Sequence, residues 1–148
     1  MTGPNTMTTG DLDAWGAKFE IGWRSRDPEA IAALFTEDAW YRQGPFAAPI
    51  IGREAILAQW TTTLNRQGDP QVWVSEPILA GDRAAAEWWC VAHDPVTGVP
   101  RTAAGCVTVW FAPDGRCRGL HEYWHGQPDT ALPPHGTWPH RRAETETR

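Results

Sequence analysis

The sequence predicts an α+β fold in which three N-terminal helices pack across a cone-shaped, curved antiparallel sheet and enclose an apolar pocket. Apolar residues recur at helical spacing in the first half, whereas strand-forming runs alternate with Gly- and Pro-containing turns in the second. The 148 residues suffice for one domain with its own core. The ten tryptophans are more than such a domain readily buries, so we expect some of them to line a cavity.

The helical half follows a polar segment, residues 1–10, that we expect to be a flexible tail. The first helix is predicted from Asp11, because an apolar residue follows at every third or fourth position. The second is predicted from Asp27, whose carboxylate caps it, to near Glu37–Asp38. After a loop rich in Pro and Gly, the third is predicted over Arg53–Leu64.

The second half predicts an antiparallel meander of four strands separated by turn sequences. The strands are expected at Gln71–Leu79, Arg83–His93, Thr102–Phe111 and Arg116–His125. The structured domain is therefore expected to span residues 11–127. The Pro-rich and then charged segment 128–148 is expected to be mostly disordered, with Trp138 as a local docking point.

Composition disfavours several classes of function. The formal net charge of -5 disfavours a nucleic-acid binder, which normally carries a basic stripe. The chain has neither a long apolar run nor a secretory signal, so we expect a cytoplasmic protein that does not span a membrane. The three cysteines lack CxxC spacing and are expected to be reduced thiols.

The stretch His121-Glu122-Tyr123-Trp124-His125 matches H-E-x-x-H, the signature of zinc metalloproteases. Zinc binding through this motif needs a helix, which places both imidazoles on one face. Here the stretch follows a Pro-Asp-Gly turn and contains strand formers, and in a strand the two histidines stand roughly 13 Å apart. We therefore expect no metal site, and a zinc hydrolase is a remote alternative.

Strand geometry divides this stretch into two faces. Leu120, Glu122 and Trp124 share one face, and His121 and Tyr123 share the other. If Glu122 points inward, burial raises the pKa of its carboxyl and suits it to general acid–base catalysis. If it points outward, it is an ordinary solvated carboxylate, and the pattern leaves both alternatives open.

Three other polar residues are candidates for the site. Tyr41 and Gln43 alternate after the second helix, so they face one side, where a phenol and an amide can hold water or polarise a substrate oxygen. The alternative role for Tyr41 is to anchor a loop. His93 ends an apolar strand and is either a secondary proton donor or a histidine at the rim.

The chain resembles the nuclear transport factor 2-like superfamily, in its SnoaL-like branch, over roughly residues 11–127. The resemblance rests on Asp-Pro-Glu-Ala-Ile-Ala-Ala-Leu-Phe (27–35), Thr-Glu-Asp-Ala (36–39), Ile-Gly-Arg-Glu-Ala-Ile (51–56) and the ending Asp-Gly-Arg…Glu-Tyr-Trp (114–124). This branch includes polyketide cyclases, limonene-epoxide hydrolase, ketosteroid isomerase and scytalone dehydratase, and also non-catalytic binding members. The resemblance implies chemistry without a cofactor and a homodimer formed through the outer sheet face, where His121 and Tyr123 would lie.

The pattern is most similar to the limonene-epoxide hydrolase group, in which a Tyr-x-Asn pair and a carboxylate before the final aromatic pair hold the attacking water. Tyr41, Gln43 and Glu122 stand at the matching positions, so the resemblance points Glu122 into the pocket. That group also uses an Arg-x-Asp pair where this chain has Trp88-Trp89-Cys90. The difference argues against simple epoxide hydrolysis and favours a polycyclic, terpenoid or polyketide substrate, with His93 or Glu87 as the replacement acid.

We therefore expect a cofactor-independent enzyme that performs cyclisation, isomerisation, dehydration or epoxide opening on a hydrophobic metabolite. Glu122 is expected to be the general acid or base, Tyr41 and Gln43 to position water or a substrate oxygen, and His93 to donate a proton. The expected pocket walls are Trp40, Trp60, Trp88, Trp89, Leu120 and Trp124. The alternative is a non-catalytic small-molecule-binding or dimerisation domain of the same fold.

Overall fold

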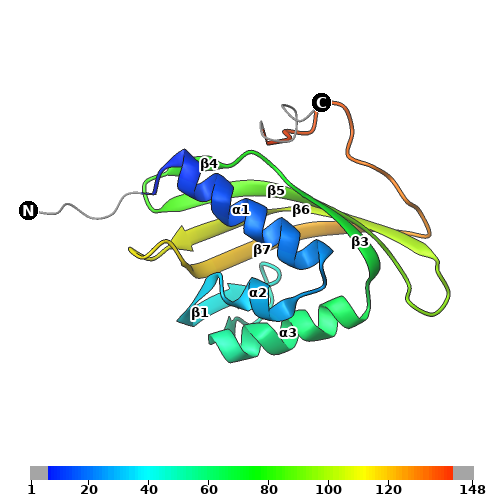
Figure 1. The fold of residues 1–148 in the computed structure, drawn as a ribbon, viewed down its shortest axis with the longest axis horizontal. Coiled ribbons are helices and arrows are strands. Elements are labelled where there is room, and N and C mark those ends of the chain that lie inside the picture. The colour runs from blue at the N-terminus through cyan, green and yellow to red at the C-terminus, as the bar shows by residue number, and fades with distance from the viewer. Residues whose placement is uncertain (1–6, 142–148) are drawn as a thin grey trace, which may run out of the picture.

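Three helices pack on one face of a curved seven-stranded sheet in the computed structural model, which describes residues 7–141 (Figure 1). The helices are α1 (Thr9–Arg24), α2 (Pro28–Ala32) and α3 (Arg53–Asn65). The strands are β1 (Phe35–Arg42), β2 (Ile50–Ile51), β3 (Gly68–Val74), β4 (Ile78–Ala80), β5 (Arg83–His93), β6 (Pro100–Phe111) and β7 (Cys117–Pro128). The predicted fold class is confirmed.

The sheet has the order β2-β1-β7-β6-β5-β3, and β4 also pairs with β5. The long strands β5, β6 and β7 form the predicted antiparallel meander, and β1 joins β7 in parallel. The predicted strand Gln71–Leu79 is instead divided into β3 and β4, which pair with different parts of β5. Pro77 lies in the break, because proline has no N–H to donate to a strand ladder.

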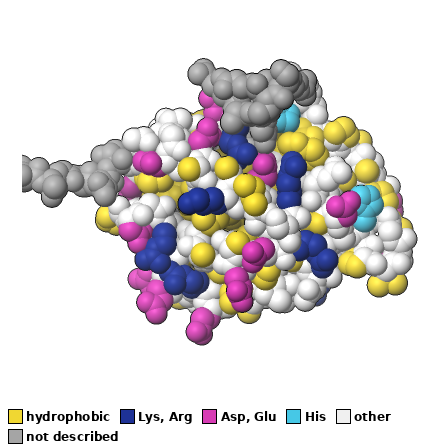
Figure 2. Space-filling view, in the orientation of Figure 1, with side chains coloured by type: hydrophobic (Ala, Val, Ile, Leu, Met, Phe, Trp, Pro, Cys, Tyr) yellow, Lys and Arg dark blue, Asp and Glu magenta, His cyan; other side chains and the backbone are white. Residues whose placement is uncertain are grey.

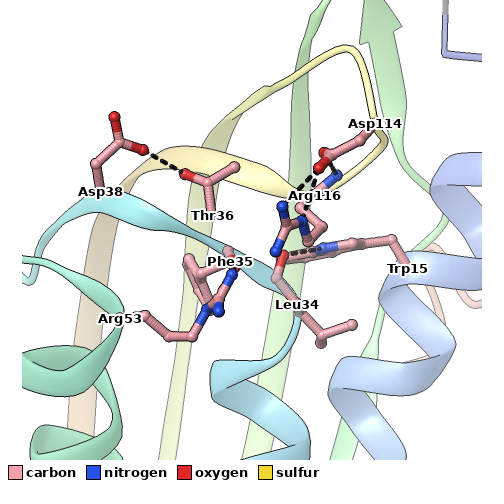
Figure 3. A network of polar contacts seen from close by, with 8 residues as sticks. All are labelled: Trp15, Leu34, Phe35, Thr36, Asp38, Arg53, Asp114 and Arg116. Carbon is pink, nitrogen blue, oxygen red and sulfur yellow. Dashed lines mark hydrogen bonds and ion pairs between the residues drawn. The ribbon is translucent and has the colours of Figure 1, made fainter.

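The second helix ends at Ala32, earlier than expected, and the residues predicted to finish it form β1 instead. The carbonyl of Leu34 accepts a hydrogen bond from the Trp15 indole (Figure 3) and a second one from the Cys117 N–H. The Phe35 carbonyl accepts two hydrogen bonds from the guanidinium of Arg53, at 3.0 and 2.8 Å. Asp38, expected at the helix end, lies on β1 and accepts a hydrogen bond from Thr36. These partners, distant in sequence, draw the chain out of the helix.

The core between the helices and the sheet is aromatic. The indole of Trp23 on α1 lies 4.9 Å from that of Trp60 on α3 and 5.3 Å from that of Trp88 on β5, measured between ring centroids. All three are buried. The Trp23–Trp60 contact is edge-to-face, an arrangement that stabilises a contact beyond the area that it buries. The cluster therefore fixes both long helices on the inner face of the sheet.

Residues 129–141 pack against the domain, in a segment for which the sequence predicted disorder with Trp138 as a local docking point. The Trp89 indole donates a hydrogen bond to the Leu132 carbonyl at 2.7 Å, and Trp138 is buried. Arg141 forms a buried ion pair with Glu20 of α1 at 3.1 Å. In Figure 1 this segment returns from the end of β7 along the sheet towards β4. Residues 142–148 of the predicted tail lie outside the described residues.

At the other terminus, α1 begins within the segment expected to be flexible. The Thr8 side chain accepts a hydrogen bond from the Asp11 N–H, and the Asp11 carboxylate accepts one from the Thr8 N–H. This reciprocal capping box starts the helix at Thr9, two residues before the predicted start. Residues 1–6 of the predicted tail lie outside the described residues.

On the helix-bearing face in Figure 2, acidic and basic side chains are interspersed among hydrophobic ones. None of the helices in the described part of the chain has the length and apolar character needed to cross a bilayer.

Candidate active site

Tyr41 and Glu122 meet inside the sheet. The parallel pairing of β1 with β7 places Tyr41 opposite Leu120, so that Glu122, two residues further on, faces the same side. The Tyr41 hydroxyl donates a hydrogen bond of 2.5 Å to Oε2 of Glu122. Tyr41 is itself almost completely buried, with 2% of its surface exposed. The carboxyl therefore points inward, the alternative that the family resemblance favoured.

Burial raises the pKa of Glu122 to about 7, and the hydrogen bond from Tyr41, which favours the charged form, opposes this shift. Burial also raises the pKa of Tyr41 well above 10, and the negative charge of Glu122 adds to the effect. Tyr41 therefore stays protonated and remains a donor. Glu122 is the member of the pair that gains and loses a proton near neutral pH.

Two hollows share this carboxyl in their linings. The wide chamber has a volume of about 590 Å³ and opens between α3 and the ends of β5, β6 and β7. The narrow chamber has a volume of only about 30 Å³ and lies under α1. Trp23, Trp88 and Glu122 line both chambers, so the carboxyl stands at the boundary between them.

Comparison with known proteins identifies the fold family. Residues 17–120 match a protein-family model described as a SnoaL-like domain. The chain belongs to the SnoaL-like domain family. No curated protein matches this SnoaL-like domain.

Two solved structures are similar to this SnoaL-like domain. One is a hypothetical protein with a ketosteroid isomerase-like fold from Catenulispora acidiphila DSM 44928, in complex with trimethylamine. It has a TM-score of 0.65 and 21% sequence identity, with 79% of this chain and 86% of that chain covered. The other is SalBIII, an epoxide hydrolase/cyclase-like enzyme with a role in pyran ring formation in the polyether salinomycin; its TM-score is 0.69 and its identity 13%, with 80% and 95% covered. At these identities the likeness shows the fold alone.

The SnoaL-like domain brings most of the predicted site residues together. Six line the wide chamber, namely Tyr41, Gln43, Trp60, Trp88, Glu122 and Trp124. Leu120 lines the narrow chamber and is buried. Their chemical roles remain proposals, but their common placement follows from the alternation along β1, β5 and β7.

Three predicted site residues lie elsewhere. The inward positions of β5 in the wide chamber are Trp88, Cys90 and Ala92, so Trp89 and His93 face the other way. His93 lines a separate hollow beside Asp94. Trp40 packs on the outer face of the sheet, with ring centroids 5.1 Å from Trp110 and 5.0 Å from His121.

Glu87, the other candidate replacement acid, occupies the outer position opposite Cys106 and is exposed. Its negative charge acts on Cys106, helping to raise the pKa of that thiol. Glu87 also borders the narrow chamber that Glu122 lines, but no hydrogen bond joins the two carboxyls among the described residues.

The H-E-x-x-H stretch lies in β7, as the turn before it predicted. His121 packs among the aromatic rings of the outer face, while Glu122 faces inward. Among residues 7–141, no group of three or more His, Cys, Asp and Glu side chains is arranged to hold a metal ion.

Sequence reasoning missed the polar groups that line the wide chamber at α3 and β6. Gln67, buried after α3, accepts a hydrogen bond of 2.7 Å from the Trp23 indole. Arg66 and Arg101 line the chamber as well. Only the β5–β6 register, which pairs Arg101 with the inward Ala92, reveals the direction of Arg101. No local motif marks any of the three.

Proposed function

We propose that this domain is a cofactor-independent acid–base enzyme that acts on a hydrophobic small molecule. The reaction class is cyclisation, isomerisation, dehydration or epoxide opening of a polyketide- or terpenoid-like metabolite. One observation carries the proposal: a carboxyl with a pKa of about 7 stands in an indole-walled chamber large enough for a metabolite. A group that titrates near the operating pH is suited both to accept and to donate a proton.

The geometry supports a division of roles. Tyr41 engages Oε2 of Glu122, fixing the carboxyl and leaving Oε1 to exchange a proton with substrate or water. Gln43 lines the same chamber, and its amide can hold the water or substrate oxygen that reacts. The indoles of Trp60, Trp88 and Trp124 exclude water from the reacting carbon skeleton. The similarity to an epoxide hydrolase/cyclase-like enzyme supports this reaction class.

The second candidate function is a non-catalytic small-molecule-binding domain. It is favoured by the placement of His93 in a separate hollow and by the exposed position of Glu87 on β5, since neither side chain is hydrogen-bonded to Glu122 among the described residues. Cys90 does line the wide chamber, but burial raises the pKa of its thiol to about 12, so it is neutral and a poor proton donor. If the domain is an enzyme, the proton that Glu122 removes must therefore be returned to the substrate by Glu122 itself, by water or by another group of the substrate.

The test begins with a screen of polyketide- and terpenoid-like compounds for binding, followed by assays of turnover for those that bind. Glu122→Gln is expected to retain binding and to lose turnover by roughly 100-fold or more, the usual contribution of a general acid or base. Glu37→Gln, at an exposed position of β1 that lines neither chamber, is the matched control and should change neither. Full turnover by Glu122→Gln would refute the acid–base role, whereas bound ligands that the wild type leaves unchanged would favour the binding domain.

A further inference from the structure

We propose that the ligand of this domain is an elongated hydrophobic acid whose anionic group binds Arg66 and Arg101 at the mouth of the wide chamber, with its apolar end at Glu122. The inference deepens the proposed function and rests on it for the identity of the reacting end. It names a substrate class, a long apolar monoanion, and two residues that select it. Its basis is the order of side chains along the inner face of the sheet.

The strand register places Arg101 and Glu122 at opposite ends of the chamber. Arg101 of β6 pairs with Ala92 and Pro128, which line the opening, whereas Val107 of the same strand pairs with Glu122. Six residues separate Arg101 from Val107, so both face inward and their Cα atoms lie roughly 20 Å apart. A ligand that touches both ends must therefore be elongated.

The mouth carries positive charge. Arg66, the C-cap of α3, and Arg101 both line the wide chamber, and neither forms an ion pair with another of the described residues. The positive field of Arg101 reaches inside, where it favours the thiolate form of Cys90. Among the described residues that line the wide chamber, only Glu122, at the far end, carries a carboxyl.

Two aspartates lie near the arginines, and neither forms an ion pair with them among the described residues. Asp94 and Asp129 line the neighbouring hollow, which Arg66 and Arg101 also border. Oδ1 of Asp94 accepts hydrogen bonds of 2.9 Å from the N–H groups of Val96 and Thr97. This carboxylate is therefore held by its own turn. The chamber side of both guanidinium groups remains suited to a carboxylate, which arginine binds in a planar, two-point geometry.

The opposite end is apolar and tight. Beyond Glu122 the narrow chamber is lined by side chains such as Val107, Val109 and Leu120, and its volume of about 30 Å³ admits only a small group. Asp13, Glu87 and Arg141 also line it. An apolar chain end or a methyl-bearing ring edge fits this space, whereas the ligand's anionic group is best stabilised at the mouth.

The experiment compares binding of decanoate with that of decanamide, which has the same chain length but no charge. Binding is followed by tryptophan fluorescence, since several indoles line the chamber. At low salt the wild type should bind decanoate about tenfold more tightly than decanamide, and raising the salt should narrow the difference. Arg101→Gln and Arg66→Gln should each weaken decanoate binding severalfold without affecting decanamide.

Arg118→Gln is the matched control, because Arg118 is an exposed arginine near the start of β7 that pairs with Asp82. It should bind both compounds as the wild type does. Equal affinity of the wild type for the two compounds would overturn the proposal. An equal loss of affinity for both compounds in Arg101→Gln would overturn it as well. If Arg118→Gln lost as much affinity for decanoate as Arg101→Gln does, the proposal would also be overturned, because only the net charge of the protein would then matter.

The same titrations in Glu122→Gln separate this inference from the proposed function. Preference for decanoate that persists in Glu122→Gln supports the acid-binding mouth whether or not turnover is lost. Full turnover in that variant refutes only the catalytic proposal. Equal affinity of the wild type for decanoate and decanamide refutes only the proposed substrate class.

Discussion

The raised pKa of Glu122 links stability to pH. Its folded-state pKa is about 7 against an ordinary value of 4.5, so the native state holds this proton more tightly than the unfolded state. The resulting stabilisation is fully present below about pH 4.5 and is lost as pH rises through about 7. Glu122→Gln removes this dependence, because the amide does not ionise. We expect the variant to be about 3 kcal/mol more stable than the wild type at pH 8 and similar to it at pH 4.5.

Urea unfolding at the two pH values measures this difference. Glu37→Gln, at an exposed position of β1, is the control and should change stability by less than about 0.5 kcal/mol at either pH. If Glu122→Gln gains nothing between pH 4.5 and pH 8, the carboxyl is not buried in the way that the structure indicates. A residue that lowers stability at working pH is typical of a functional site.

Tyr41 lowers the pKa of Glu122 and so opposes the effect of burial. Its hydrogen bond favours ionised Glu122, so Tyr41→Phe should raise the pKa of Glu122 further above 7, by about one unit. The inflection in the pH dependence of turnover should move upward by the same amount, and a carboxyl titration by NMR would show it directly. Tyr123→Phe, the same change on the outer face, should leave it in place. An unchanged or lowered inflection in Tyr41→Phe would contradict the assigned hydrogen bond.

At the level of single residues, the sequence predicted which side chains share a face better than which face is inside. Period-two alternation grouped Glu122 with Leu120 and Trp124 correctly, but only the resemblance indicated that this group lines the pocket. The same ambiguity explains Trp89 and His93. In a strand with tryptophan at two successive positions, apolarity cannot distinguish the inward one, and the pairing with β3 and β6 decides it.

The close approach of β6 and β7 depends on one glycine. A Cβ on Gly105 would lie 2.1 Å from the Tyr123 carbonyl oxygen and 2.7 Å from the Trp124 Cβ. Gly105→Ala must therefore push β7 away, and we expect a loss of about 2–3 kcal/mol of stability in urea unfolding. Because Trp124 lines the wide chamber, ligand affinity should fall as well.

Gly44→Ala is the matched control, since nothing lies within 4 Å of a Cβ built there. It should cost less than about 0.5 kcal/mol. If Gly105→Ala were no more costly than Gly44→Ala, the two strands would not be in the close contact described.

Element boundaries were least predictable where distant partners decide them. The helix signal over 28–37 is real locally, since Asp27 caps its first turn as predicted. The chain nevertheless leaves the helix after Ala32, because backbone carbonyls at Leu34 and Phe35 meet donors from α1, β7 and α3. Local propensity does not contain this information. The meander, whose strands neighbour one another in sequence, was predictable almost in full.

For the molecule as a whole, the segment 129–141 extends the domain beyond the family match, which ends at residue 120. Average composition predicted disorder, but a few residues with specific partners outweigh it. Arg141 and Glu20 form an ion pair that is nearly inaccessible to solvent, and Glu20 also accepts a hydrogen bond from the Val74 N–H. Arg141→Met should therefore cost about 3 kcal/mol, because it leaves a buried carboxylate poorly compensated.

Arg118→Met supplies the comparison, since the ion pair of Arg118 with Asp82, at 3.2 Å, is about as short as that of Arg141 but is exposed. It should cost less than about 1 kcal/mol. Thermal or urea unfolding of both variants measures the difference. Equal, small losses would mean that the segment does not hold to the domain in solution.

The outer face of the sheet supports an assembly that the family resemblance implies. Trp40, Trp110 and His121 pack together there, and Tyr123 beside them keeps 45% of its surface exposed. We propose that this aromatic surface is the interface of a homodimer, because self-complementary apolar patches typically form two-fold interfaces. Sedimentation at micromolar concentration should show a dimer. Tyr123→Lys should yield monomers, since it places a like charge from each subunit in the contact.

Val96→Lys, in an exposed turn between β5 and β6, introduces the same charge away from this surface and should remain dimeric. A monomeric wild type would refute the assembly, and dissociation in both variants would show that net charge, not this surface, controls it. The interface and the wide chamber occupy opposite faces of the same strands, so β7 carries Tyr123 outward and Glu122 inward. Dissociation should therefore lower the stability of the protein but leave the pKa of Glu122 unchanged, because Tyr41 holds that carboxyl from within one subunit.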